Sequence, residues 1–83
     1  MKLRVLYFAR LRERFGVGEE SLECVGGTVA DLLAQLRARG GAWAEELAAG
    51  RTFRVAVDQS IVPPDTPLAD GAEVAIFPPV TGG

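Results

Sequence analysis

Apolar and polar residues alternate near both ends of the chain, and a period of two is typical of a β-strand with one buried face. The alternation runs through residues 2–8 (KLRVLYF) and residues 73–77 (EVAIF). One face of each stretch is apolar: Leu3, Val5 and Tyr7 in the first, Val74 and Ile76 in the second. We therefore expect the chain to begin and end with strands.

Further strands are predicted between these two. Residues 21–25 form a weaker strand, and residues 53–57 alternate cleanly, with Phe53, Val55 and Val57 inward. A tight turn at Asp58-Gln59 leads into a short strand over residues 60–62. The prolines that follow exclude a central strand and predict a loop over residues 63–67.

A helical period of apolar residues marks the middle of the chain. One side of this helix would carry Val29, Leu32, Leu33 and Leu36. It would begin at a capping box formed by Thr28 and Asp31, and Gly40-Gly41 would end it. Shorter helices are expected over residues 9–15 and residues 42–49, the second ended by Gly50 and burying part of Trp43 and Leu47.

The order of these elements predicts an α+β domain in which one mixed sheet is covered on one face by the main helix. Ubiquitin-like β-grasp proteins have this order. The opposite face would then carry apolar side chains that no element is left to cover: Leu6, Phe8, Ala56, Ala75 and Phe77. Such a patch marks a partner surface, unless the second short helix or the proline loop covers it.

The length of 83 residues predicts a single domain, with a globular body over residues 1–77 and an extended tail over residues 78–83. The apolar runs are too short for a membrane span. Basic residues near the start of the chain interrupt the apolar stretch that a signal peptide would need, so we expect no signal peptide. A single cysteine allows no internal disulfide and fits a reducing compartment, so we expect a cytoplasmic protein that does not associate with a membrane.

Net charge and its distribution bear on the partners. A net charge of −2 argues against nucleic-acid binding. Positive charge is concentrated near the start of the chain, at Lys2, Arg4, Arg10, Arg12 and Arg14. No basic residue follows Arg54. This pattern fits either an ordinary solvated surface or a basic rim that a partner contacts.

The residues that usually carry chemistry are scarce. The chain has no histidine, which excludes Ser-His-Asp and Cys-His catalysis and the usual zinc sites, so we expect no bound metal. Cys24 has no second cysteine beside it and is expected to be a small buried hydrophobe. Gly26-Gly27 lacks the spacing of a phosphate-binding loop and predicts a turn between strand and helix.

The C-terminus is the most specific part of the sequence, and it reads Phe77-Pro78-Pro79-Val80-Thr81-Gly82-Gly83. The prolines cannot continue a sheet ladder and favour an extended geometry, so they would end the strand and project the tail. Val80 and Thr81 would span the distance to a partner, and Gly82 would pass through a narrow channel because it has no side chain.

The α-carboxylate of Gly83 is the only special group on this tail. A carboxylate is a poor acyl donor because its oxygen is a poor leaving group. A partner enzyme that uses ATP can convert it to a glycyl adenylate, from which AMP is easily displaced. A sulfur nucleophile would then leave a thiocarboxylate (1-thioglycine), whereas a lysine amine would form an isopeptide. In both cases the domain is a carrier and not an enzyme on its own.

Residues 70–83 (DGAEVAIFPPVTGG) resemble the C-terminus of the MoaD family, the small subunits of molybdopterin synthase. Residues 5–13 (VLYFARLRE) are similar to that family's first strand and short helix, and Ala72 departs from the acidic residue often found after Asp-Gly. The resemblance implies a ubiquitin-like sulfur carrier. An adenylyltransferase of the ubiquitin-activating type would activate Gly83 with ATP, and a sulfur donor such as a cysteine desulfurase system would supply the sulfur.

The resemblance also implies the later steps of the pathway. The tail would enter the large subunit of molybdopterin synthase, in a heterotetramer, and donate sulfur to cyclic pyranopterin monophosphate in molybdenum cofactor biosynthesis. The partner-facing positions that it implies are Phe8, Arg12, Ile61 and Phe77, followed by the tail residues Pro78, Pro79, Val80 and Thr81. Strand alternation independently places Phe8 and Phe77 outward, whereas Arg12 and Ile61 rest on the resemblance alone.

Three alternatives remain open at this point. The first is a sulfur carrier for another product, such as the thiazole of thiamin or a thiolated tRNA base. The second is a ubiquitin-like modifier that is attached to target lysines through Gly83. The third is a β-grasp interaction domain whose tail is inert.

Overall fold

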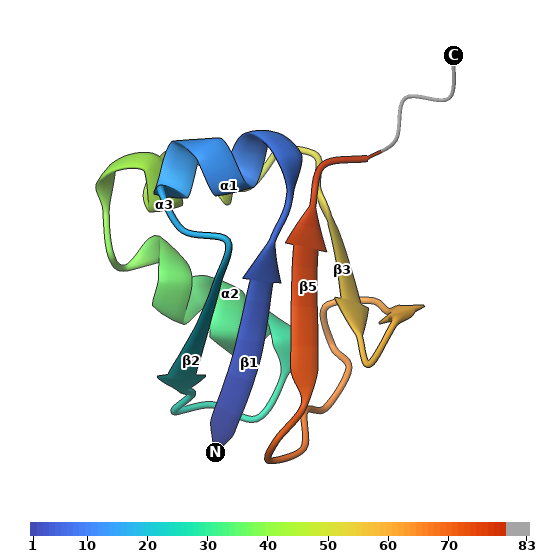
Figure 1. Cartoon of the computed structure of the whole chain (residues 1–83). Helices are drawn as coiled ribbons and strands as arrows, with labels where there is room; N and C mark the ends of the chain where they lie inside the picture. The colour runs from blue at the N-terminus through green and yellow to red at the C-terminus, as the bar shows by residue number, and fades with distance from the viewer. Residues whose placement is uncertain (80–83) are drawn as a thin grey trace.

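A computed structural model of the chain describes residues 1–79, which form one five-stranded sheet in the order β2-β1-β5-β3-β4, with three helices (Figure 1). In chain order the elements are β1 (Lys2–Tyr7), α1 (Ala9–Phe15), β2 (Glu19–Glu23), α2 (Val29–Arg37), α3 (Gly41–Glu46), β3 (Arg54–Val57), β4 (Ser60–Ile61) and β5 (Glu73–Phe77). All the elements predicted from the sequence are therefore found.

The centre of the sheet is a parallel pair. β1 and β5 run side by side, with Val5 opposite Val74 and Tyr7 opposite Ile76. The remaining ladders, between β1 and β2, β3 and β5, and β3 and β4, are antiparallel. Both central strands point toward α1 in Figure 1, so the chain leaves β5 at the end of the sheet where α1 lies.

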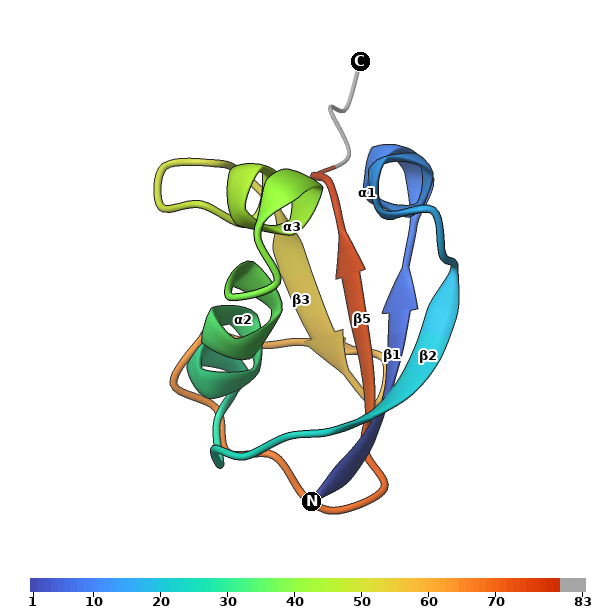
Figure 2. The ribbon, with the colours of Figure 1, turned by 90° about the vertical axis from the view of Figure 1, so that its left-hand side faces the viewer.

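One face of the sheet is covered and the other is open. Figure 2 shows α2 and α3 on one side of the strands, and the core lies between α2 and the sheet. The inward residues predicted for α2, namely Val29, Leu32, Leu33 and Leu36, are all buried. The covered face of the sheet contributes Leu3, Val5, Tyr7, Leu22, Val55, Val74 and Ile76. The predicted single sheet with a helix on one face is confirmed.

Several boundaries differ from the prediction because backbone contacts outweigh the apolar pattern. β2 begins at Glu19, since Glu19 and Glu20 pair with Leu6 and Val5. The prediction that Gly40-Gly41 ends the main helix is wrong. Ala38 closes α2 by donating its N–H to the oxygen of Ala34 at 3.1 Å, and Gly40, with a φ of 77°, is the N-cap of α3.

A network of aromatic and charged side chains holds the helices against the sheet. The ring of buried Tyr7 meets the rings of Phe15 and Trp43 edge-on, at 5.3 Å and 5.2 Å between centroids. Its hydroxyl donates to Glu20 at 2.7 Å, and Arg39 donates two hydrogen bonds of 2.8 Å to the same carboxylate. Burial and the Glu20 carboxylate raise the pKa of Tyr7, while the Arg39 guanidinium lowers the pKa of Glu20.

The turn into α2 depends on Gly26. The carboxylate of Asp31 accepts the backbone N–H groups of Gly27 at 2.9 Å and Thr28 at 3.1 Å, and Thr28 Oγ1 accepts the N–H of Asp31 at 3.2 Å. These hydrogen bonds lower the pKa of Asp31 and complete the predicted capping box. A Cβ on Gly26 would clash with the Asp31 side chain. The chain's own carboxylate therefore fills this glycine turn, as expected of a structural turn.

This close approach predicts different effects for two neighbouring glycines. Gly26→Ala should cost about 1–3 kcal/mol of unfolding free energy, because the added methyl group displaces Asp31 from the helix N-terminus. Gly27→Ala is the matched control, since a Cβ there meets nothing within 4 Å, and it should change stability by less than about 0.5 kcal/mol. Urea unfolding followed by circular dichroism measures both. Equal effects would contradict the role of Gly26.

Candidate functional site at the tail root and the open sheet face

A row of apolar side chains crosses the open face of the sheet. Leu6 pairs with Ala75, Ala75 with Ala56, and Ala56 with Ile61, and directly paired residues point to the same side of a sheet. Phe77 lies on this face two residues after Ala75, and Phe8 follows β1 beside it, with its N–H bonded to the oxygen of Ile76 at 3.2 Å. We call these residues the open-face strip: Leu6, Phe8, Ala56, Ile61, Ala75 and Phe77.

The open-face strip is accessible to a partner. Ile61 is 66% exposed and Phe8 is 45% exposed, which is unusual for large apolar side chains. α3 lies on the covered side of the sheet (Figure 2), and the loop over residues 63–67 bonds to the start of α2 through Pro64 and Thr66. The prediction that neither element covers this face is therefore confirmed for residues 1–79. Sequence alternation placed Phe8 and Phe77 here; Ile61 joins them through the β3–β4 pairing.

Two arginines stand beside the strip. Arg54 lies opposite Phe77 in the ladder, and Arg12 follows Phe8 by one turn of α1, with its aliphatic stem against Gly18. Within residues 1–79 neither guanidinium forms an ion pair with a carboxylate. The strip is therefore flanked by positive charge at the end where the chain leaves β5.

The root of the tail begins where the prolines were expected to end the last strand, because β5 ends at Phe77. Pro78 and Pro79 are half-buried and line a cavity of about 470 Å³ together with Arg10 and residues 50–52. The first two tail residues thus lie against the body of the molecule. The predicted site residues Val80, Thr81, Gly82 and Gly83 lie outside the described residues.

A buried carboxylate organises the arginines at this root. Glu46, at the end of α3, is only 4% exposed. Its two oxygens accept hydrogen bonds from Arg10 Nε at 3.1 Å, Arg14 Nε at 3.1 Å and Arg51 Nη2 at 3.2 Å. Burial alone would raise the pKa of Glu46, but the arginines outweigh it and hold that pKa below its usual value. Glu46 is therefore an ion that ties α1, α3 and the segment before β3 together.

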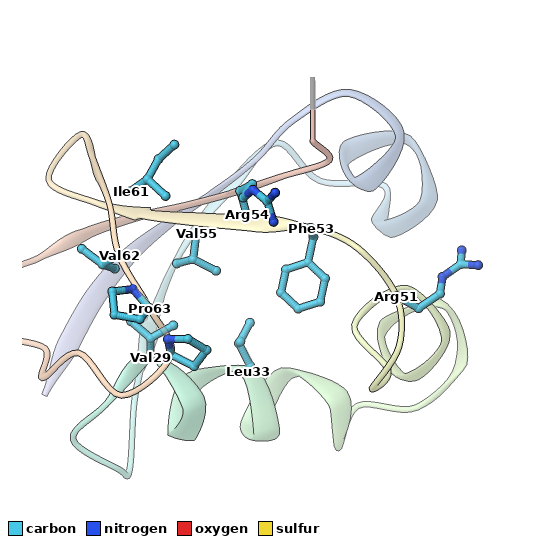
Figure 3. Close-up of a pocket in the computed structure, with 10 residues that line it drawn as sticks. Val29, Leu33, Arg51, Phe53, Arg54, Val55, Ile61, Val62 and Pro63 are labelled. Carbon is cyan, nitrogen blue, oxygen red and sulfur yellow. The ribbon is translucent and has the colours of Figure 1, made fainter. Parts of the chain in front are cut away.

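A second hollow, of about 520 Å³, opens between β3 and α2 on the covered side of the sheet (Figure 3). Figure 3 shows Phe53 and Val55 facing Leu33 and Val29 across it, while Ile61 points to the other side of the sheet. Among residues 1–79, Arg51 and Arg54 are the only charged residues that line it, and none of its lining side chains there is an acid or a nucleophile.

Residues 1–79 lack the usual constellations for catalysis. Cys24 is buried in the core, as predicted, and shows no partner that would activate it. No group of three acidic or cysteine side chains within this part of the chain is placed to hold a metal ion. None of its helices has both the length and the apolar character needed to cross a membrane.

Sequence reasoning missed the Glu46 cluster. Its members come from α1, α3 and the segment before β3, and no local pattern connects these three segments. One signal was present, because Glu46 lies three residues after Trp43 and directly before Leu47, on the side of the short helix predicted to be buried. A charged residue on a buried helix side requires partners, and Arg51, five residues further along the chain, was the nearest arginine.

Comparison with known proteins adds to this geometry. Residues 5–83 match the model of the ThiS family. The chain is 42% identical to the molybdopterin synthase sulfur carrier subunit of Escherichia coli, over 98% of the chain and 99% of that protein. It is also 42% identical to the protein of the same name from Chlamydomonas reinhardtii, over the full length of both.

Solved structures show the same architecture. A putative molybdopterin converting factor subunit 1 from Pyrococcus furiosus superposes with a TM-score of 0.81 at 32% identity, covering 96% of this chain and 99% of that one. Small archaeal modifier protein 1 from Haloferax volcanii superposes with a TM-score of 0.84 at 26% identity over the full length of both chains. The fold is the ubiquitin-like β-grasp of these carriers.

The charge on Glu46 makes stability depend on pH. Because its pKa is lowered in the folded state, its contribution is present above the unfolded-state pKa and is lost as the pH falls through the folded-state value. Glu46→Gln should therefore destabilise the protein near pH 7, because three arginines lose their shared counterion. The loss should be limited to about 1–3 kcal/mol, because the half-exposed arginines regain water. Urea unfolding at a series of pH values from neutral to acidic measures this. The difference between the two proteins should shrink in acid, and a constant difference would contradict it.

Proposed function

The chain belongs to the ThiS family, and from that premise we propose that it is the sulfur-carrying small subunit of molybdopterin synthase. One observation carries the proposal: the curated relatives that share 40–42% of its residues across nearly the whole chain all bear this function in their names. The fold supports it, because parallel pairing of β1 with β5 brings the tail root to an open, apolar face suited to a partner.

In this proposal the reactive group is the α-carboxylate of Gly83. A carboxylate oxygen attacks the α-phosphorus of ATP in an adenylating partner, and pyrophosphate leaves. A sulfide-equivalent nucleophile, delivered by a sulfur donor, then attacks the carbonyl carbon of the adenylate. AMP departs with the electrons of the broken carbon–oxygen bond, and a thiocarboxylate remains on Gly83. Gly82 lies within the narrow channel of the partner during these steps.

The second half of the cycle takes place in the large subunit. The thiocarboxylate sulfur attacks a carbon of cyclic pyranopterin monophosphate and displaces the oxygen substituent of that carbon. Water then cleaves the acyl–sulfur bond of the resulting thioester, which leaves the sulfur on the pterin and returns Gly83 to a carboxylate. A dithiolene contains two sulfur atoms, so each product consumes two charged carriers. This requirement fits a heterotetramer with two small subunits. The carrier binds no cofactor in either half of the cycle, and the catalytic groups belong to its partners.

The open-face strip supplies the docking surface in this scheme. Phe8, Ile61 and Phe77 present exposed or half-exposed apolar area around small residues at the centre of the strip. Arg12 and Arg54 give the rim a positive charge, and Pro78 and Pro79 begin the path that continues through Val80 and Thr81. Contact along β5 therefore leads directly into the channel that receives the tail.

A modifier function is the second candidate. The likeness to small archaeal modifier protein 1 of Haloferax volcanii favours it, because an activated Gly83 also reacts with a lysine amine. Lys2 is the only lysine of this chain, so chains of linked copies would have to form through that single residue. The names of the curated relatives favour sulfur transfer for molybdopterin over this function, and over thiamin or tRNA thiolation.

The covalent state of Gly83 tests the proposed function. Incubation with the adenylating enzyme, ATP and a sulfur source should raise the mass of the chain by the difference between sulfur and oxygen, and fragmentation should place the change at Gly83. Deletion of Gly83 should abolish the mass change while leaving the melting temperature unaltered. An unchanged mass under conditions that charge the Escherichia coli relative would refute sulfur transfer.

Binding to the large subunit tests the docking surface. Ile61→Ala should raise the dissociation constant by about tenfold or more, because it removes an exposed apolar anchor from the strip. Val25→Ala is the matched control, since Val25 is also an exposed aliphatic residue, at 95%, but lies outside the strip. Isothermal titration calorimetry measures both variants. If the two bind equally well, the strip is not the contact surface.

A further inference from the structure

The cavity at the tail root has a composition that suits an anion. Its lining is Arg10 from α1, residues 50–52 from the segment before β3, and the two prolines of the tail root. Within the part of the chain that the structure describes, no acidic residue lines it. Pro78 and Pro79 have no N–H groups of their own, so the guanidinium groups are the strongest donors at its wall. The site is built from three segments that are far apart in the sequence.

The arginines of this cavity are held in place before any ligand arrives. Arg10 contacts Glu46 through Nε and Arg51 does so through Nη2. A guanidinium has five N–H donors in a fixed plane, so each of these arginines keeps further donors for a second acceptor. Because Glu46 is buried and fixes both side chains, a ligand there would not have to order them, and preorganisation of this kind favours binding.

The charge balance around the cavity is positive. Arg10, Arg14 and Arg51 surround Glu46, and Glu45 pairs with Arg14, so the cluster has one more positive than negative charge. Arg54 adds another at the same end of β5, opposite Phe77. The opposite end of the strand is mixed in charge, because Asp58 accepts the N–H of Glu73 at 3.0 Å and Arg4 lies opposite Glu73 in the ladder. The end of β5 where the tail leaves is therefore a region of net positive charge.

We propose that this cavity binds a carboxylate side chain on the rim of the channel into which a partner takes the tail. This inference deepens the proposed function and rests on it. A carboxylate matches the planar, bidentate geometry of a guanidinium, and an acidic rim would attract the positive end of the carrier first. The site is built into the tail root itself, so its occupation also fixes where the tail starts.

The position of the site sets a distance in the complex. Four residues follow Pro79, and they span at most about 14 Å when extended. A rim carboxylate bound by Arg10 and Arg51 would therefore lie beside the start of this span, and the atom that reacts with Gly83 would lie near its other end. Binding of the rim carboxylate in the cavity would fix the position of the tail root relative to the channel, and the length of the tail would then place Gly83 at the reacting centre.

Removal of the two arginines tests the site. The variant Arg10→Gln/Arg51→Gln should raise the dissociation constant for the large subunit of the same organism by about tenfold, mainly through slower association. Lys2→Gln/Arg4→Gln removes the same charge at the other end of β1 and should bind like the wild type. Stopped-flow association of the wild type should also slow markedly between about 50 and 500 mM NaCl. An affinity of the arginine variant equal to that of the wild type overturns the proposal.

Further measurements separate the possible failures. If the double variant melts at a lower temperature than the wild type, the single variant Arg10→Gln replaces it in the binding measurement. Arg14 and Arg51 still contact Glu46 in that variant, so its fold should be retained. If sodium pyrophosphate raises the melting temperature of the wild type but not of the double variant, the cavity binds a free phosphate and the proposal is wrong. Thiocarboxylate formation is measured on the same samples. If the wild type neither binds the large subunit nor forms the thiocarboxylate, the proposed function itself is refuted. If the double variant forms the thiocarboxylate and binds with wild-type affinity, only the carboxylate site is refuted.

Discussion

Parallel pairing of β1 with β5 at the centre of the sheet is the constraint on which the rest of the molecule depends. Neighbouring parallel strands end at the same edge of a sheet, so this pairing places the end of β5 beside Phe8 and the start of α1. An antiparallel arrangement would direct the last residues toward the N-terminus instead. The position of the tail root, the neighbouring phenylalanines and the arginines around them all follow from the direction of one strand pair.

The second constraint is that α2 covers only one face of the sheet. The strip on the other face is graded in size, with Ala56 and Ala75 at its centre and Ile61 and Phe77 nearer its ends. Small central residues limit the apolar area exposed in the free protein and let a partner approach the sheet closely. The larger side chains at the periphery then supply most of the contact area. A carrier that must bind successive partners and release each of them benefits from this compromise.

Sequence reasoning succeeded where a single element determines its own pattern. β5 and α1 have the predicted bounds, and the buried side of α2 is the predicted one, because strand and helix periods are local properties. It failed at the end of α2, where two glycines predicted the C-cap but Ala38 closes the helix and Gly40 is the N-cap of α3. It also failed where distant segments meet, because the arginines around Glu46 converge only in the folded chain. Ile61 joined the strip through pairing with Ala56, which alternation within one strand cannot reveal.

The separation between body and tail also determines where reactivity is controlled. Pro79 is the last described residue beside the arginines of the cavity. The carboxylate of Gly83 can lie up to about 14 Å further along an extended tail. Exposed charges are largely screened beyond about 8 Å at physiological ionic strength. The body therefore has little influence on the reactivity of Gly83 when the tail is extended in water. Activation has to come from whichever partner encloses the tail, so one carrier can be charged by one enzyme and discharged by another without any change in its own fold.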